Sequence, residues 1–159
     1  MRNPTAIQLN DYKVPPFLIS ETELRVELSE DETTVTTQLK IRRNPESDER
    51  DIPLVLDGTN MQLQSVMIDD RELTSNEYGV TDEDLTLYDV PGYFTLETVV
   101  SIKPQDNTAL EGLYKSGDMF CTQCEAEGFR NITYYHTFRN KHCTHGTIKQ
   151  NFFSFYQLK

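Results

Sequence analysis

The chain has 159 residues, of which 36% are hydrophobic and 26% charged, and its formal net charge is −11. This length suits one domain with a core of its own. The negative charge excludes nucleic acid and an anionic membrane surface as main partners, because both repel an acidic protein. No apolar run is long enough to span a bilayer, and the N-terminus lacks the apolar stretch of a signal peptide. We therefore expect a cytoplasmic protein whose three cysteines are free thiols.

Up to about residue 102, the pattern of apolar and polar residues is typical of short strands. Alternating apolar and polar residues, or a short apolar run, predict strands at 24–28, 35–41, 52–56, 63–68 and 94–102. Turn residues separate them, including Asp57-Gly58 and Asp69-Asp70. Only Asn107–Tyr114 could form a helical turn. Turns about every ten residues indicate an all-β fold, an antiparallel sandwich or meander rather than βαβ units.

The composition changes near residue 128. All 26 acidic residues precede that point, which leaves residues 1–127 with a net charge of −16 and residues 128–159 with +5. The last segment also holds eight of the 16 aromatic residues. Such a difference indicates either a distinct functional arm or sequence that was not selected together with the rest.

All cysteines and histidines lie within residues 119–145. Cys121 and Cys124, with Cys143 and a histidine such as His142 or His145, could supply the soft ligands of a zinc site. The second half of this set lacks the usual ligand spacing, so unligated thiols are the preferred interpretation. A redox Cys-x-x-Cys pair is also weakly supported, because no strand-to-helix junction lowers a thiol pKa.

Two carboxylates, Glu125 and Glu127, follow the second cysteine in a loop of small residues. A carboxylate at a loop tip can accept a charge-assisted hydrogen bond from an ammonium group. The alternative is that one of them forms a salt bridge with Arg130. The residues alone leave both possibilities open.

The stretch Asn107–Arg130, which includes Cys-Thr-Gln-Cys-Glu-Ala-Glu-Gly-Phe-Arg, and the following Ile132-Thr-Tyr-Tyr resemble the N-terminal domain of bacterial aminopeptidase N, a family of zinc-dependent aminopeptidases. Tyr12-Lys-Val-Pro-Pro-Phe-Leu-Ile-Ser is also similar to the start of that domain. The resemblance implies a β-rich saddle that packs on a catalytic domain of the same chain. By position, it implies that Glu125 binds the free α-amine of a peptide and that Gln123 lines the pocket for the first side chain.

The resemblance covers about residues 9–135, so we predict an aminopeptidase N-like β domain over 1–135 and a divergent, unrelated tail over 136–159. The zinc motif His-Glu-x-x-His and the family's Gly-x-Met-Glu-Asn motif are absent from this sequence. We therefore expect no metal site and no catalytic residue in this chain, with zinc bound only by the catalytic domain of the family.

Two hypotheses about function follow, in addition to a zinc-binding module that would use Cys121, Cys124, Cys143 and a histidine. The first is an aminopeptidase N-terminal domain that carries the amine-recognition loop and is inactive alone. The second is a non-catalytic interaction module that reuses the same β domain. Because the divergent tail replaces the family's last strands, the β domain should be incomplete at its C-terminal end. That would leave an unpaired sheet edge through which copies could self-associate.

Overall fold

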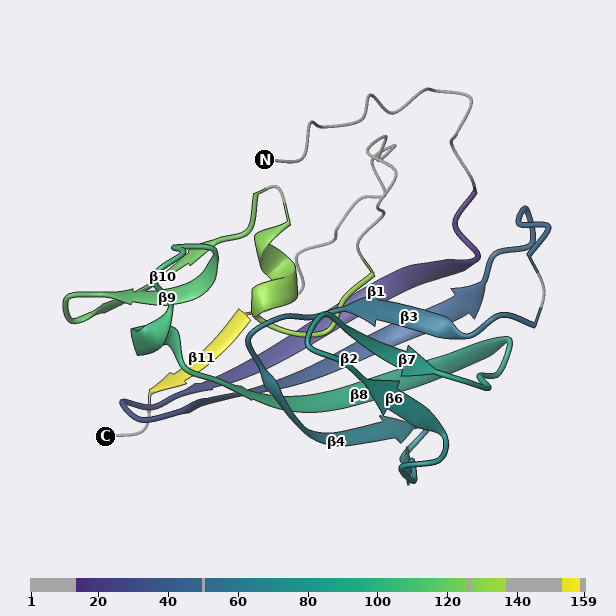
Figure 1. The fold of residues 1–159 in the computed structure, drawn as a ribbon, viewed down its shortest axis with the longest axis horizontal. Coiled ribbons are helices and arrows are strands. Elements are labelled where there is room, and N and C mark those ends of the chain that lie inside the picture. The colour runs from purple at the N-terminus through teal and green to yellow at the C-terminus, as the bar shows by residue number, and fades with distance from the viewer. Residues whose placement is uncertain (1–13, 50, 126, 137–152, 158–159) are drawn as a thin grey trace.

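The computed structural model describes residues 14–49, 51–125, 127–136 and the backbone of 153–157. Its strands form three sheets (Figure 1). The largest has six strands in the order β11-β1-β2-β8-β4-β5, which are β1 (Phe17–Leu28), β2 (Thr33–Arg43), β4 (Gln62–Ile68), β5 (Arg71–Glu72), β8 (Tyr93–Ile102) and β11 (Phe153–Gln157). A three-stranded sheet contains β3 (Leu54–Asp57), β7 (Asp84–Leu87) and β6 (Tyr78–Val80), and a hairpin contains β9 (Gly112–Ser116) and β10 (Met119–Gln123).

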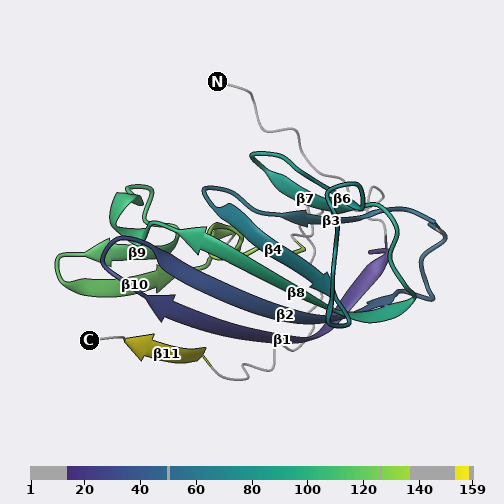
Figure 2. The ribbon, with the colours of Figure 1, turned by 90° about the horizontal axis from the view of Figure 1, so that it is seen from below.

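The core lies between the large sheet and the three-stranded sheet. Alternate residues of β2, such as Val35, Leu39 and Ile41, are buried on one face of the large sheet. Leu56 and Leu85, which are register partners in the smaller sheet, are also fully buried. Figure 2 shows the smaller sheet lying over one face of the large one, as in a sandwich. The prediction of an all-β, antiparallel architecture is confirmed.

The expected helical turn at 107–114 is wrong. The described residues contain two short 3-10 helices, η2 (Pro104–Asp106) and η3 (Gly128–Asn131), and β9 begins at Gly112. Leu110 and Gly112 have φ values of +57° and +77°, which no right-handed helix can accommodate. The Asn107 side chain also donates to the carbonyls of Glu111 and Leu113, so local side-chain hydrogen bonds replace helical ones.

The outer edge of β1 is partly covered. Leu24–Leu28 pairs in parallel with β11, whereas Phe17–Glu23 has no described strand on that side. On this side of β1, the described residues therefore leave Phe17–Glu23 unpaired, and self-association through an edge stays a prediction. Most of the predicted tail, residues 137–152 and 158–159, lies outside the described residues, so its separate origin stays a prediction.

Candidate functional site

The loop that the sequence singled out follows the β9–β10 hairpin, which extends beyond one end of the large sheet (Figure 1). Gln123 is the last residue of β10 and is the register partner of Gly112 in β9. Gln123 and Glu125 are both exposed, and Cys124 between them is half-buried. The hairpin therefore presents the two candidate recognition residues to solvent on either side of a partly covered thiol.

Gly128 allows the loop to close tightly. Its backbone N–H donates to the carbonyl oxygen of Cys124 at 3.1 Å. A Cβ atom at this position would lie 2.3 Å from the carbonyl oxygen of Gln123 and 2.9 Å from the backbone nitrogen of Gly112. Both neighbours are backbone atoms that cannot rotate away, so only glycine fits here. The path of the chain through Gln123–Glu125 thus depends on Gly128.

The base of the loop is tied to the turn before β4. The Thr59 N–H donates to the Arg130 carbonyl oxygen at 3.0 Å, and the Thr59 hydroxyl donates to Oδ1 of Asn131. Asn60 Nδ2 donates to the same Asn131 oxygen at 3.4 Å. Asn131 therefore joins η3 to a turn about 70 residues earlier in the chain. Sequence reasoning missed this residue, because nothing in its neighbourhood marks an amide as a long-range hydrogen-bond acceptor.

The segment after η3 is anchored in the core. Asp57 and Tyr135 exchange backbone hydrogen bonds of 2.8 and 2.9 Å as an isolated antiparallel bridge. Tyr134 is 1% exposed and packs against Gly58, where a Cβ atom would lie 2.3 Å from the Tyr134 ring. Burial, with a smaller contribution from the charge of Asp84, raises the pKa of Tyr134. The loop at residues 123–131 therefore starts and ends on fixed elements.

The two carboxylates of the loop, Glu125 and Glu127, differ in their ion pairing. Arg130 Nη2 lies 3.3 Å from Oε2 of Glu127, one turn apart on the same segment. Glu125 makes no ion pair or hydrogen bond with any of the described residues. The carboxylate that forms the salt bridge with Arg130 is therefore that of Glu127. This pairing leaves the Glu125 carboxylate exposed and available to a cation from outside.

The two cysteines beside the loop, Cys121 and Cys124, are free thiols. Burial raises the pKa of the Cys124 thiol, which lowers the fraction of the reactive thiolate at neutral pH. Within the described part of the chain, no three His, Cys, Asp or Glu side chains are grouped so that they could hold a metal ion. His142, Cys143 and His145 lie outside the described residues.

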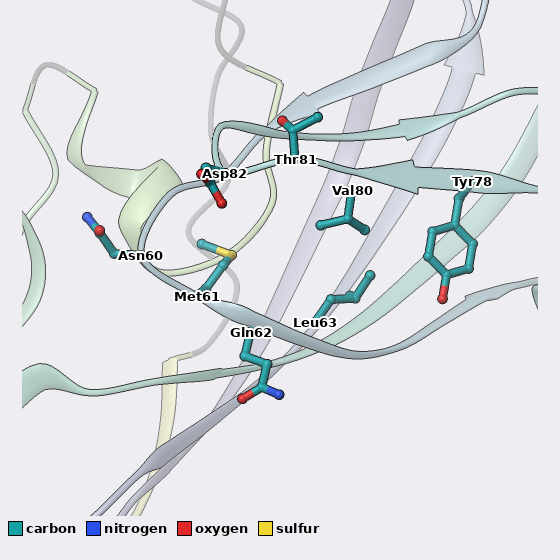
Figure 3. Close-up of a pocket in the computed structure, with 9 residues that line it drawn as sticks. Asn60, Met61, Gln62, Leu63, Tyr78, Val80, Thr81 and Asp82 are labelled. Carbon is teal, nitrogen blue, oxygen red and sulfur yellow. The ribbon is translucent and has the colours of Figure 1, made fainter. Parts of the chain in front are cut away.

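Two hollows lie on the surface of the described residues. An open groove of about 700 Å³ runs between the start of β4 and β6, with Met61, Leu63 and Val80 directed into it and Asp82 at its rim (Figure 3). A second hollow, of about 520 Å³, includes Asn131 among its lining residues. Gln123 and Glu125 line neither hollow.

No helix among the described residues is both long and apolar enough to cross a membrane.

No family model matches the chain. Aminopeptidase N of Caulobacter vibrioides is 48% identical over 132 residues, which is 83% of this chain and 15% of that protein. Aminopeptidase N of Escherichia coli is 43% identical over 136 residues, or 84% of this chain and 15% of that protein.

A solved aminopeptidase structure is also similar to this chain. Legionella pneumophila aminopeptidase A, crystallised with aspartic acid, superimposes with a TM-score of 0.73 at 32% identity, over 80% of this chain and 15% of that one. The chain thus spans about 15% of the length of the proteins it matches. These matches confirm the resemblance inferred from the residues: over about four fifths of its length, the chain belongs to the aminopeptidase N family and corresponds to its N-terminal domain.

Proposed function

We propose that this domain carries the part of an aminopeptidase that recognises the free N-terminus of a peptide. Glu125 accepts a charge-assisted hydrogen bond from the α-ammonium group, and Gln123 contacts the first side chain. The observation that supports this role most directly is the pairing of Glu127 with Arg130, because it leaves Glu125 exposed and without an ionic partner among the described residues.

The requirement for a free α-ammonium follows from charge. An acetylated N-terminus is neutral and bulkier, so it cannot donate the same hydrogen bond. The relatives are named aminopeptidases, and the Legionella structure contains a free amino acid, aspartic acid. A single charge-assisted bond contributes about 1.5–3 kcal/mol, so the domain alone should bind weakly, with a Kd on the order of 10 mM or above.

We further propose that this chain does not hydrolyse peptides by itself. Zinc in such enzymes activates the attacking water, and this needs three protein ligands with an open position. The sequence contains no His-Glu-x-x-His motif, and the described residues offer no cluster of three possible ligands. Zinc therefore does not fit the described domain, and a partner catalytic domain would have to supply it.

The test is an NMR titration of the purified chain with leucinamide and, separately, with N-acetyl-leucinamide. We expect leucinamide alone to shift the backbone amide signals of residues 121–128, and Glu125→Gln to abolish the shifts. Glu127→Gln is the matched control and should retain them. Equal shifts with the acetylated compound, or unchanged shifts in Glu125→Gln, would contradict the proposal.

A chromogenic aminoacyl substrate tests the second part. We expect no turnover above that of a preparation from cells without the gene. Turnover that follows the 18.4 kDa chain through successive columns would show that the chain is catalytic.

A further inference from the structure

The groove of about 700 Å³ between the start of β4 and β6 lies between two strands that each lack a neighbour on one side (Figure 3). In the three-stranded sheet, β6 is outermost and pairs only with β7. In the large sheet, β5 pairs with β4 only at Met67 and Ile68. On that side, Gln62–Ser65 has no neighbouring strand among the described residues. Strand edges of this kind offer backbone hydrogen bonds to an extended segment.

The ladder between β6 and β7 decides which backbone groups of β6 are available. The Thr81 N–H donates to the carbonyl oxygen of Asp84, its partner just beyond the ladder, at 2.9 Å. Bonded and non-bonded pairs alternate along an antiparallel ladder, so Gly79 is the β6 residue that bonds to β7. The backbone N–H and C=O groups of Tyr78 and Val80 therefore point away from β7, toward the open edge.

The side chains beside this edge are apolar and face the inside of the sandwich. Tyr78 and Val80 are register partners of two fully buried leucines of β7, and Val80 is 46% exposed. Residues directly opposite each other on neighbouring strands have their side chains on the same face. A strand added beside β6 would thus direct every second side chain into the groove, against Met61 and Leu63. The volume of the groove lies within the range of binding pockets, about 300–1,000 Å³.

The two ends of the groove differ in charge. Near Tyr78, the carboxylate of Glu77 is paired with Arg71, with Nη2 and Oε1 2.9 Å apart. At the other end, Asp82 lies at the rim and Glu83 follows it, and both side chains are exposed. In the part of the chain that the structure describes, neither of these two carboxylates is in an ion pair. This end of the groove therefore favours a positively charged residue.

We propose that this groove binds an extended segment of another protein, which adds a fourth strand to the three-stranded sheet, antiparallel to β6. The segment has apolar residues at alternate positions, because these enter the groove. It has lysine or arginine toward its N-terminal end, because an antiparallel segment places that end beside Asp82. An antiparallel pair is slightly more stable per residue than a parallel one. This binding is separate from the amine recognition proposed for Glu125, which does not line the groove.

The test uses the peptide acetyl-Lys-Lys-Val-Thr-Val-Thr-amide, titrated into the purified chain and followed by NMR. Its acetyl group removes the α-ammonium, so the peptide cannot bind in the way proposed for Glu125. We expect the backbone amide signals of residues 61–65 and 78–82 to shift and those of residues 121–128 to stay in place. Absence of shifts in the first two segments would overturn the proposal, whatever the outcome of the leucinamide titration.

Methylation of the peptide backbone tests the pairing without changing the protein. In the proposed arrangement, the valine residues lie opposite Tyr78 and Val80, and their N–H groups donate to β6. Methylation of both valine nitrogens should therefore abolish the shifts. Methylation of both threonine nitrogens, whose N–H groups face solvent, is the matched control and should preserve them. Equal binding of the two methylated peptides, or the reverse order, would overturn the antiparallel pairing.

A pair of charge variants tests the acidic end. Asp82→Asn with Glu83→Gln should weaken binding by about threefold to tenfold, because exposed charge pairs each contribute little. Glu111→Gln with Asp118→Asn removes the same number of exposed charges from the β9–β10 region and should leave binding unchanged. Equal weakening in the two double variants would show that only the net charge of the chain matters.

The same NMR signals identify other occupants of the groove. If the amides of residues 61–65 and 78–82 shift when the chain alone is diluted, a second copy fills the groove. If they shift when residues 137–159 are deleted, the tail of the same chain fills it. We expect neither change, and either one would overturn the proposed occupant.

Discussion

The sandwich and the loop at residues 123–131 are stabilised by different interactions. The sandwich buries alternate apolar residues of long strands, such as Leu39 in β2 and Leu96 in β8, which are register partners. The loop has few buried apolar side chains and depends on Gly128, on Asn131 and on backbone hydrogen bonds. The sandwich should tolerate many substitutions of one hydrophobic residue by another. The conformation of the loop depends on individual contacts, such as the close approach of backbone atoms to Gly128.

The largest expected effect is on the contact where the two regions meet. Tyr134→Ala removes a fully buried ring that packs on Gly58, and we expect the free energy of unfolding to fall by about 3–5 kcal/mol. Urea denaturation measures this loss. Tyr93→Ala, at a side chain that is 63% exposed, should change stability by less than about 0.5 kcal/mol. Equal losses in the two variants would show that the Tyr134 ring does not hold the regions together.

Gly128→Ala should affect the loop more than the sandwich. The added methyl group would lie 2.3 Å from the Gln123 carbonyl oxygen, so the backbone must shift, at a cost of about 1–3 kcal/mol. Hydrogen exchange should show faster opening at residues 123–131, with the amides of β2 and β8 unchanged. Gly92→Ala, where the added Cβ meets open space, is the control and should leave both regions as they are. Uniform loss of protection in Gly128→Ala would argue against a separate loop.

A hydroxyl pair measures how strongly the segment after the loop is held to the sheet. Oγ1 of Thr37 donates to Oγ1 of Thr133 at 2.7 Å, and both residues are fully buried. Thr133→Val leaves the buried Thr37 hydroxyl without its hydrogen-bond acceptor and should lower the free energy of unfolding by about 1–3 kcal/mol. The double variant Thr37→Val, Thr133→Val should recover most of that loss. A double variant as unstable as the sum of the single ones would show that the hydrogen bond contributes nothing.

The smallest effect concerns a surface charge far from the loop. The hydrogen bond from Arg71, followed by those from the Thr74 backbone and hydroxyl, lowers the pKa of Glu77 to about 2. Because this pKa is depressed in the folded state, the stabilisation is present above the ordinary value of about 4.5 and is lost as pH falls toward 2. Arg71→Leu should return the pKa, measured by NMR, toward its ordinary value. Arg25→Leu is the control, and an equal rise there would rule out the local cause.

Sequence patterns located β2, β4 and β8 because alternation extends over seven or more residues, but they found only the second half of β1, whose first half lacks regular alternation. They missed β6 and β7, which have three and four residues and too few alternations to stand out. They also missed the β9–β10 hairpin, in which few residues besides Leu113 are buried and whose start depends on the positive φ of Gly112.

The role of the candidate site residues stays a prediction, and their arrangement could not be read from the sequence. The resemblance named Gln123 and Glu125, and the structure places both on the exposed side of the loop. Which carboxylate pairs with Arg130 could not be decided from spacing, because Glu127 reaches it only through the 3-10 turn of η3. The contacts of Asn131 with Thr59 and Asn60 link segments far apart in sequence, which local patterns do not record.

The Thr37–Thr133 hydrogen bond has a consequence for the order of folding, because its partners are 96 residues apart in the chain. Contacts of such sequence separation form late, after the entropy of closing the intervening chain has been overcome. The β1–β2 hairpin can form while the chain is still being synthesised, but the loop with Glu125 cannot reach its final position until residue 133 has left the ribosome. The part of the domain that is proposed to recognise a peptide N-terminus is therefore expected to become ordered after the β1–β2 hairpin.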